Sequence, residues 1–382
     1  MIEIRDKSMC VGCTACMSVC PKKCISMHED TEGFVYPSVD NLHCIGCNLC
    51  VAVCPVIHPT CYHNQPKIVK AACSNHEEDR MESSSGGVFS LLSEQILLNA
   101  GEVWGAAFDE DWRVSHMRVT SMERLAVIRG AKYVQSNLGE SFRTIKQSLD
   151  SGKWVLFSGT PCQVTGLKRY LHKDYERLLL VDVVCHGVPS YKVFRSFLKE
   201  EFGHKSITSV SFRDKTTGWK KYNLCVHYNS EGEDGVKRFT SKANLYMYGF
   251  ISNLYLRPSC YSCKFKGCMS GSDITLGDFW GIDNVAPEMD DDKGTSLVLT
   301  HTEKGKQWFE MVRSLCRCKE LPYLSAYQNN KSLEQSSLKN PWRSLFFKDL
   351  DRKFFSQLLW SFERPSLLSR IRLRWYSLFN NK

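Results

Sequence analysis

The protein has 382 residues, of which 43% are hydrophobic and 12% aromatic. This composition excludes a wholly disordered chain, and the length is sufficient for two or three domains. No apolar run approaches the ~18 residues of a membrane-spanning helix, and the first residues, MIEIRDKSMC, lack the features of a secretory signal. We therefore expect a cytoplasmic protein.

Cysteine and positive charge are the unusual features of the composition. The chain contains 19 cysteines and carries a formal net charge of +9. In a reducing compartment, cysteines are expected to bind metal rather than to form disulfides. Ten basic and three acidic residues between Leu338 and Lys382 account for +7 of the net charge, so the positive charge is local. A nucleic-acid-binding domain would spread its charge over a folded face, and we expect no nucleic-acid partner.

Two runs of cysteines near the N-terminus have the spacing C-x2-C-x2-C-x3-C-P, at 10–21 and 44–55. Bacterial two-cluster ferredoxins have this spacing, and in them the fourth cysteine of each run ligates the other cluster. A pair of structural zinc sites is the alternative, but it would normally show C-x2-C pairs with longer spacers. The predicted ligands of the two [4Fe-4S] clusters are Cys10, Cys13, Cys16 and Cys54 for the first, and Cys20, Cys44, Cys47 and Cys50 for the second. Cys24 and Cys61, just outside the runs, are expected to be packing residues.

From residue 67 onward, short β-rich runs alternate with helical patterns. The expected strands cover 68–73, 103–108, 154–159 and 178–185, and the expected helices cover 86–98, 136–149, 161–171 and 189–202. This alternation predicts an α/β domain with a largely parallel sheet, followed by two or three antiparallel strands over 206–239. The predicted fold class is therefore α+β, with an N-terminal bacterial-type two-cluster ferredoxin domain followed by a mixed α/β domain.

A turn of serines and glycines, SSSGG at 83–87, precedes the expected helix over 86–98. It places hydroxyls and free N–H groups at a positive helix N-terminus, which suits a phosphate. An N-cap with a glycine-containing turn is the simpler interpretation, and the motif alone favours it. A second segment, RGAKYVQS at 129–136, clusters a cation, an aromatic ring and an amide between two helical stretches.

Single cysteines follow two successive strands of the predicted sheet, in GTPCQ at 159–163 and in CHG at 185–187. Open α/β sheets bind ligands at the carboxyl ends of their strands. Farther along, Cys260 and Cys263 form a C-x2-C pair, which by itself is ambiguous between a cluster, a zinc site and a redox disulfide. Joined with Cys162 and Cys185, this pair yields four thiolates.

These motifs, together with SDITLGDFWG at 272–281, resemble the coenzyme F420 hydrogenase and formate dehydrogenase beta subunit family over about residues 1–309. The resemblance implies an iron–sulfur flavoprotein. Its mixed α/β domain would be a flavin-binding domain that holds FAD next to a [4Fe-4S] cluster. The flavin would exchange hydride with a deazaflavin or another two-electron partner.

The resemblance also implies site residues. A third [4Fe-4S] cluster would be ligated by Cys162, Cys185, Cys260 and Cys263, with Cys268 in reserve for one position. The implied flavin site is lined by Ser85, Gly86, Gly87, Lys132, Tyr133 and Gln135. Lys132 is the candidate catalytic residue, as a cation near the reduced flavin, and a structural ion pair is the alternative role for it.

The predicted domains are a ferredoxin domain over 1–60, a linker and first strand over 61–82, the FAD/[4Fe-4S] domain over 83–320, and a basic tail over 321–382. The predicted function is an iron–sulfur flavoprotein oxidoreductase that passes electrons between clusters and a flavin. Its partner would be a redox protein or a small-molecule hydride donor or acceptor, F420-like or other. The alternatives are a non-catalytic electron-transfer subunit and a zinc-stabilised interaction protein.

The end of the tail has apolar residues at helical spacing over 367–379, interleaved with arginines. This basic amphipathic pattern predicts a helix that docks on the catalytic domain or on a partner subunit. Weak contact with a membrane surface is the alternative.

Overall fold

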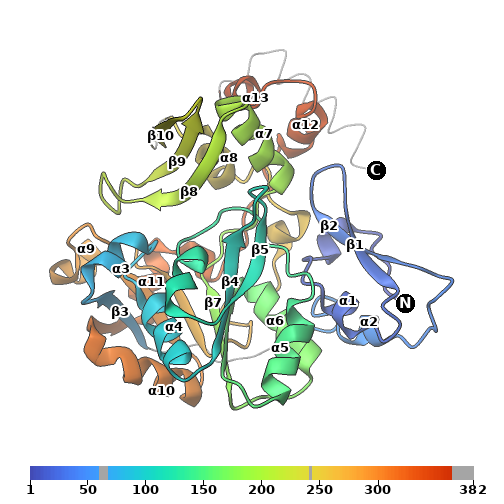
Figure 1. The fold of residues 1–382 in the computed structure, drawn as a ribbon, viewed down its shortest axis with the longest axis horizontal. Coiled ribbons are helices and arrows are strands. Elements are labelled where there is room, and N and C mark those ends of the chain that lie inside the picture. Colours follow the sequence, from blue (N-terminus) through green and yellow to red (C-terminus); the bar gives the residue numbers. More distant parts are fainter. Residues whose placement is uncertain (60–67, 241–242, 364–382) are drawn as a thin grey trace.

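The computed structural model describes residues 1–59, 68–240 and 243–363, which are arranged around three β-sheets (Figure 1). The predicted α+β fold class is confirmed. Among the described residues, no helix has both the length and the apolar character needed to cross a membrane. The helix expected over 367–379 and Cys61 lie outside the described residues.

The first sheet belongs to the N-terminal ferredoxin unit. Its elements are η1 (Lys7–Met9), α1 (Ala15–Val19), β1 (Ile25–Glu29), β2 (Val35–Val39) and α2 (Leu49–Ala52). Strands β1 and β2 form an antiparallel hairpin in which Ile25 is paired with Val39. Gly12 and Gly46, inside the two cysteine runs, have φ of 71° and 67°, a left-handed conformation that glycine adopts without steric cost.

The second sheet has eight strands in the order β13-β3-β12-β11-β7-β6-β4-β5. The strands are β3 (Ile68–Ser74), β4 (Glu102–Phe108), β5 (Val114–Val119), β6 (Val155–Gly159), β7 (Leu178–Val183), β11 (Ile274–Asp278), β12 (Ser296–Thr300) and β13 (Cys316–Pro322). The predicted strands at 68–73, 103–108, 154–159 and 178–185 correspond to β3, β4, β6 and β7.

The expectation of a largely parallel sheet is wrong. Only the central strands β11, β7, β6 and β4 pair in parallel, and every other pairing in the sheet is antiparallel. The turn over 109–113 between β4 and β5 shows one reason. It is too short for the crossover that a parallel connection requires, so β5 must run antiparallel to β4. β5 was not among the strands expected from the sequence, so this constraint was not part of the prediction.

Helices cover both faces of the eight-stranded sheet. On one face lie α4 (Val88–Leu98) and α10 (Glu303–Val312), and on the other lie α5 (Ser141–Asp150) and α6 (Pro161–Leu171). Successive residues of β6 alternate between the two cores, with Leu156 on the α4 side and Phe157 on the α6 side. This burial of both faces is typical of central parallel strands. The helix expected over 136–149 begins only at Ser141, because Asn137 bridges to β5 and Gly139 is left-handed.

The ferredoxin unit packs against the α6 side of the sheet, and its buried residues continue the core formed by α5 and α6 (Figure 1). The turn between β1 and β2 reaches a different part of the chain. There, the carboxylate of Glu32 accepts hydrogen bonds of 2.9 and 2.5 Å from Arg343. The N-terminal unit is therefore attached to both parts of the larger body.

The third sheet, in the order β10-β9-β8, lies above the large sheet in Figure 1 with four helices around it. Its strands are β8 (Ser206–Asp214), β9 (Asn223–Ser230) and β10 (Glu233–Phe239), and its helices are α7 (Tyr191–Phe202), α8 (Leu245–Ile251), α12 (Arg343–Asp349) and α13 (Phe355–Glu363). The three strands are antiparallel, as predicted.

The described part of the predicted tail is packed into the body. Phe346 of α12 and Leu358 of α13 are fully buried in the aromatic core that also contains Phe194 of α7. The predicted boundary at residue 320 falls inside β13, which pairs along its whole length with β3. The described residues beyond 321 thus complete the large sheet and the core of the smaller one.

We expect Gly86→Ala to destabilise the fold. A Cβ at position 86 would lie 2.2 Å from the carbonyl oxygen of Ala72 in β3 and 2.6 Å from the amide nitrogen of Ser296 in β12. Because both are backbone atoms of the sheet, relief requires movement of strands, and we expect a loss of about 1–3 kcal/mol in the free energy of unfolding. Differential scanning calorimetry should show a lower melting temperature.

Gly235→Ala in β10 is the matched control. The three atoms nearest to its Cβ would all belong to the side chain of Tyr228, which can rotate away, rather than to backbone. An unchanged melting temperature in Gly86→Ala, or an equal fall in the control, would contradict the close-packing role of Gly86.

Candidate functional site

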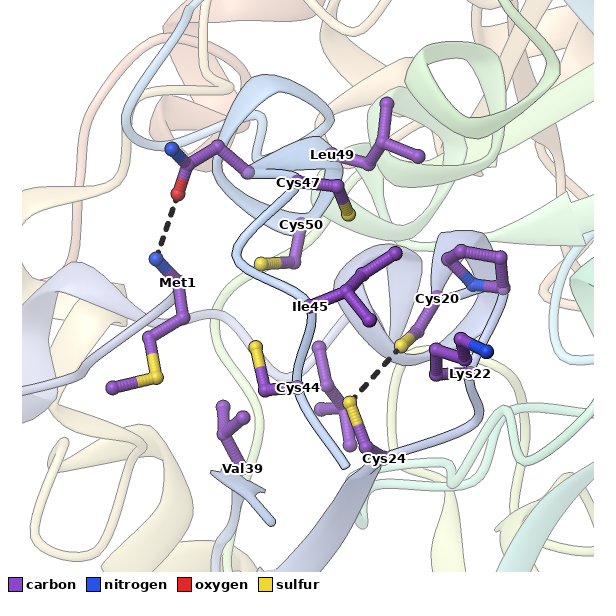
Figure 2. Close-up of a pocket in the computed structure, with 13 residues that line it drawn as sticks. Met1, Cys20, Lys22, Cys24, Val39, Cys44, Ile45, Cys47, Leu49 and Cys50 are labelled. Atoms are coloured by element: carbon purple, nitrogen blue, oxygen red, sulfur yellow. Dashed lines mark hydrogen bonds between the residues drawn. The ribbon is translucent and has the colours of Figure 1, made fainter. Parts of the chain in front are cut away.

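Two cavities in the ferredoxin unit are lined by cysteines. Cys44, Cys47 and Cys50 of the second run share one cavity with Cys20 of the first run (Figure 2). The other cavity is lined by Cys10, Cys13 and Cys16 of the first run together with Cys54 of the second. The structure thus brings together the predicted ligand sets, including the exchange of the fourth cysteine between the runs. Cys24, expected to be a packing residue, is buried beside Cys20 with 3.5 Å between the sulfur atoms.

The two cavities differ in their access to solvent. Cys47 is exposed, and the apolar side chains of Met1, Ile45 and Leu49 around the same cavity are exposed as well. The cysteines of the other cavity are mostly buried, and burial raises the pKa of Cys16 to about 12. Ligation of iron removes such a proton, since the thiolate is the ligand.

The four cysteines proposed for a third cluster also converge. Burial raises the pKa of Cys162 well above its usual range, and the neighbouring thiols of Cys263, Cys185 and Cys260 raise it further. Burial likewise raises the pKa of Cys185 to about 11 and that of Cys260 to about 12. Cys162 lies in the first turn of α6, Cys185 follows β7, and the other two come from η3 (Pro258–Ser262) and the residue after it.

Hydrogen-bond donors surround the sulfur atoms of this set. The amide of Val188 donates to Cys260 Sγ at 3.4 Å, and Thr160 Oγ1 lies 3.2 Å from Cys162 Sγ. Backbone hydrogen bonds from Gly187 and Phe265 counteract the rise that burial causes in the pKa of Cys185 and Cys263. Hydrogen bonds to sulfur are among the features by which proteins set the potential of iron–sulfur clusters. The donor set therefore fits a four-thiolate cluster.

Cys268 has different neighbours. Burial raises its pKa to about 12, and the charged and hydrogen-bonding groups near it are Asp182, Tyr323 and Glu334 rather than the other cysteines. Lys266, which the sequence analysis did not single out, lies closer to the set. Its ammonium donates to the carbonyl oxygen of Cys185 and, at 2.9 Å, to that of Ser332.

Helix α6 connects the ferredoxin unit to the third cysteine set. Gly166 lies one turn after Cys162, and a Cβ at position 166 would be 2.7 Å from Cys13 Cβ and 3.0 Å from Cys13 Sγ. The absence of a side chain at Gly166 is what permits this approach. The cavity of Cys13 and the set that contains Cys162 are thus separated by a single helical turn.

A large cavity of about 870 Å³ opens on the other side of the third set. It is bounded by the N-terminus of α4, by the segment 129–136 and by the carboxyl ends of β6 and β7, and Cys185 itself lines it. Gly87, with φ of 87°, is the N-cap residue of α4, and no side chain caps this helix end. The volume is within the range of sites that enclose cofactors.

The six residues expected to line a flavin site are not all at this cavity. Ser85, Gly87, Lys132 and Tyr133 line it, but Gly86 and Gln135 do not. Gly86 lies between β3 and β12, where a side chain would not fit. Gln135 points toward the ferredoxin unit and donates from Nε2 to the carbonyl oxygen of Val11 at 3.1 Å. Local sequence pattern does not reveal which side of a segment faces a cavity.

Lys132 is a half-buried cation at the wall of the cavity. Its ammonium donates to the backbone carbonyls of Val127 at 3.2 Å and Arg129 at 2.7 Å, and no ion pair with a carboxylate forms among the described residues. Burial lowers its pKa from the usual 10.5 to about 7. In the part of the chain that the structure describes, no carboxylate is therefore present to give Lys132 the alternative role of a structural ion pair.

The cavity wall also contains a buried ion pair that the sequence analysis missed. Arg213 of β8 donates to Asp278 Oδ2 at 2.6 Å and to the hydroxyl of Tyr133 at 3.2 Å. Asp278 lies within the SDITLGDFWG motif, so the sequence did contain a signal that could have identified it as a site residue. Arg213 stands in an ordinary antiparallel strand, and only the tertiary structure places it at the cavity.

Comparisons with known proteins agree with this arrangement. Residues 9–57 match the 4Fe-4S dicluster domain, and residues 152–320 match the C-terminal region of the coenzyme F420 hydrogenase/dehydrogenase beta subunit. The predicted family is thus confirmed by residues 152–320, which match the C-terminal region of its members, and the N-terminal unit is an iron–sulfur domain.

Two relatives illustrate the similarity. The chain is 24% identical to a subunit of the F(420)H(2) dehydrogenase of Methanosarcina mazei over 335 residues, covering 84% of this chain and 87% of the relative. A solved structure of the F420-reducing [NiFe] hydrogenase complex from Methanosarcina barkeri contains a chain that is 16% identical. That comparison covers 77% of this beta-subunit homologue and 91% of the other chain, with a TM-score of 0.48.

We expect Gly166→Ala to disturb the first ferredoxin cluster selectively. Alanine normally stabilises a helix interior relative to glycine, but here the added methyl group would press on Cys13. Anaerobic EPR of the reduced protein should show a weakened or altered first-cluster signal. The second cluster, which Gly166 does not approach, is the internal control, and equal loss of both signals would contradict the assignment.

Proposed function

We propose that this protein is an iron–sulfur flavoprotein oxidoreductase in which electrons pass between three [4Fe-4S] clusters and an FAD bound in the large cavity. The single observation that supports this most is the continuity of the sites. The exposed cavity around Cys47 lies in the same small unit as the buried one around Cys13, which contacts α6 one turn from Cys162. Cys185 of the third set then lines the large cavity.

A flavin is the group that suits the end of this path. When bound, it accepts single electrons and exchanges hydride with a two-electron partner. The uncapped N-terminus of α4 and the ammonium of Lys132 supply the positive groups that a pyrophosphate requires. The ring of Tyr133 and the apolar side chains of Phe250 and Ile128 supply surface for an aromatic ring system. The hydride partner is an F420-like deazaflavin or another two-electron substrate.

The exposed face around the second cluster is the proposed entry or exit point for electrons. Electron transfer needs a short distance between the cluster and the redox partner, and only this cluster has an exposed ligand among the ferredoxin cysteines. The matching relative is named as a subunit of a dehydrogenase. We propose that a partner subunit docks here and that the protein works in the cytoplasm as part of a larger complex.

The third cluster is tested by its iron content. We expect about twelve irons per chain after anaerobic purification, from three four-iron clusters. Cys260→Ser should lower the yield by about four irons because it removes one of the four converging thiols. Cys268→Ser is the matched control and should keep all of them. A yield of about eight irons without flavin from the unmutated protein would support the non-catalytic alternative.

The role of Lys132 is tested by the pH dependence of FAD affinity. Because its pKa is lowered to about 7, Lys132 is charged below that pH and becomes neutral above it. We therefore expect fluorescence titrations to show weaker FAD binding at pH 8 than at pH 6. At pH 6, Lys132→Met should bind about tenfold more weakly, the equivalent of one charge-assisted hydrogen bond.

Lys132→Arg provides the control, since it keeps its charge across this range and should remove the pH dependence. Equal affinities of the unmutated protein at pH 6 and pH 8 would contradict the proposed contact between Lys132 and FAD.

A further inference from the structure

Arg257 is a fully buried cation at the seam between the ferredoxin unit and the larger body. Its guanidinium donates to the carbonyl oxygen of Cys10 at 2.8 Å and to the carbonyl oxygen of Val35 at 3.0 Å. A third hydrogen bond of 3.0 Å goes to Oε1 of Gln135. Nη2 also lies 3.5 Å from the sulfur of Cys10, a predicted ligand of the first cluster. The rings of Tyr36 and Phe34 cover it at 4.4 and 5.6 Å from its centre.

The absence of a carboxylate partner distinguishes Arg257 from the other buried arginines. Among the described residues, Arg80, Arg213 and Arg343 are the others, and they pair with Asp291, Asp278 and Glu32. No such ion pair involves Arg257 in the same part of the chain; every partner of its guanidinium is a neutral oxygen or a cysteine sulfur. A buried charge without a counter-charge is costly, so this position calls for a nearby anion.

The third cysteine set adjoins Arg257 on the opposite side. The backbone amide of Cys260 donates to the carbonyl oxygen of Arg257 at 2.9 Å. The backbone amide of Arg257 donates to the carbonyl oxygen of Val188 at 3.0 Å. Val188 in turn donates to Cys260 Sγ. The backbone of Arg257 thus adjoins a predicted ligand of the third cluster, whereas its guanidinium adjoins Cys10 of the first.

We infer that Arg257 raises the reduction potential of the first cluster and, to a smaller extent, that of the third, and that it leaves the second unchanged. This inference rests on the proposed function for its third-cluster part only. A four-iron cluster with four thiolates carries a net negative charge, which supplies the anion that Arg257 lacks. Reduction adds one more negative charge, so a buried cation at hydrogen-bond distance favours the reduced form.

The charge of Arg257 also affects the direction in which electrons move between the clusters. The cations near the second cluster differ from Arg257. Arg143 donates to the carbonyl oxygen of Cys20 at 3.4 Å, but it is paired with the carboxylate of Glu140. Lys22 and the ammonium of Met1 line the cavity but are exposed, so water screens their charge. By raising the potential of the first cluster, Arg257 therefore favours the transfer of an electron from the exposed second cluster to the first. Arg257 acts only through the positive charge that it places beside the clusters, and it takes no part in the hydride exchange.

The experiment is a redox titration of the full-length protein followed by EPR. Arg257→Met removes the charge and the hydrogen bonds, and Arg257→Lys keeps the charge but not the geometry of the guanidinium. The signals are assigned beforehand with Cys10→Ser, Cys44→Ser and Cys185→Ser. We expect Arg257→Met to lower the equilibrium constant for reduction of the first cluster at least tenfold, which is about 59 mV for one electron. The third cluster should shift in the same direction and the second should not, while Arg257→Lys should show a smaller shift.

Arg343→Lys is the matched control, because Arg343 also joins the ferredoxin unit to the body but donates to a carboxylate rather than to a cysteine. It should leave all three potentials unchanged. The inference is overturned if the first-cluster potential of Arg257→Met equals that of the unmutated protein, or if all three clusters shift equally. If Arg257→Met does not retain its clusters, Arg257→Gln, which removes the charge but keeps a hydrogen-bond donor, decides. A first-cluster potential equal to that of the unmutated protein then overturns the inference.

The two proposals fail in different ways. A protein with two clusters and no flavin would contradict the proposed function, yet the shift of the first cluster would still measure the effect of Arg257. A protein with three clusters and flavin but no shift would contradict only the role of Arg257.

Discussion

The guanidinium of Arg257, buried where the ferredoxin unit meets the larger body, is the contact on which the arrangement of the sites depends. It donates to the backbone carbonyls of Cys10 and Val35, and the main chain of Arg257 is hydrogen-bonded to Cys260 and Val188. An unpaired charge is costly in a protein interior, so negative groups nearby would stabilise the seam. The cysteines predicted as cluster ligands lie next to it.

The eight-stranded sheet explains why distant cysteines meet. Parallel strands end at the same edge, so Cys162 after β6 and Cys185 after β7 lie next to each other. Helix α6 must then start at this edge, and its first turns face the ferredoxin unit, with Gly166 against Cys13. Cys260 of η3 and Cys263 directly after it complete the set, although they follow the smaller sheet in the sequence.

The large cavity lies where the two larger sheets approach each other. The pair of Arg213 from β8 and Asp278 from β11 joins them across its wall, and Arg213 also binds the hydroxyl of Tyr133. The wall is therefore held by charge-assisted hydrogen bonds as well as by apolar packing. Lys132 is not part of this network, which leaves its ammonium available to a ligand of the cavity.

Local spacing was enough to determine the chemistry of the N-terminal unit and the class of the fold. Three closely spaced thiolates of each run must wrap around one cluster site, while the fourth reaches the other site. Alternating strand and helix patterns indicate an α/β sheet from short-range periodicity alone. The tertiary structure alone decided which groups face one another. The antiparallel strands β12 and β13, the placement of Gln135 at the seam rather than in the cavity, and the contact of Arg257 with Cys10 join residues that are far apart in the chain. No local pattern encodes such pairs, because burial and charge compensation act between neighbours in space.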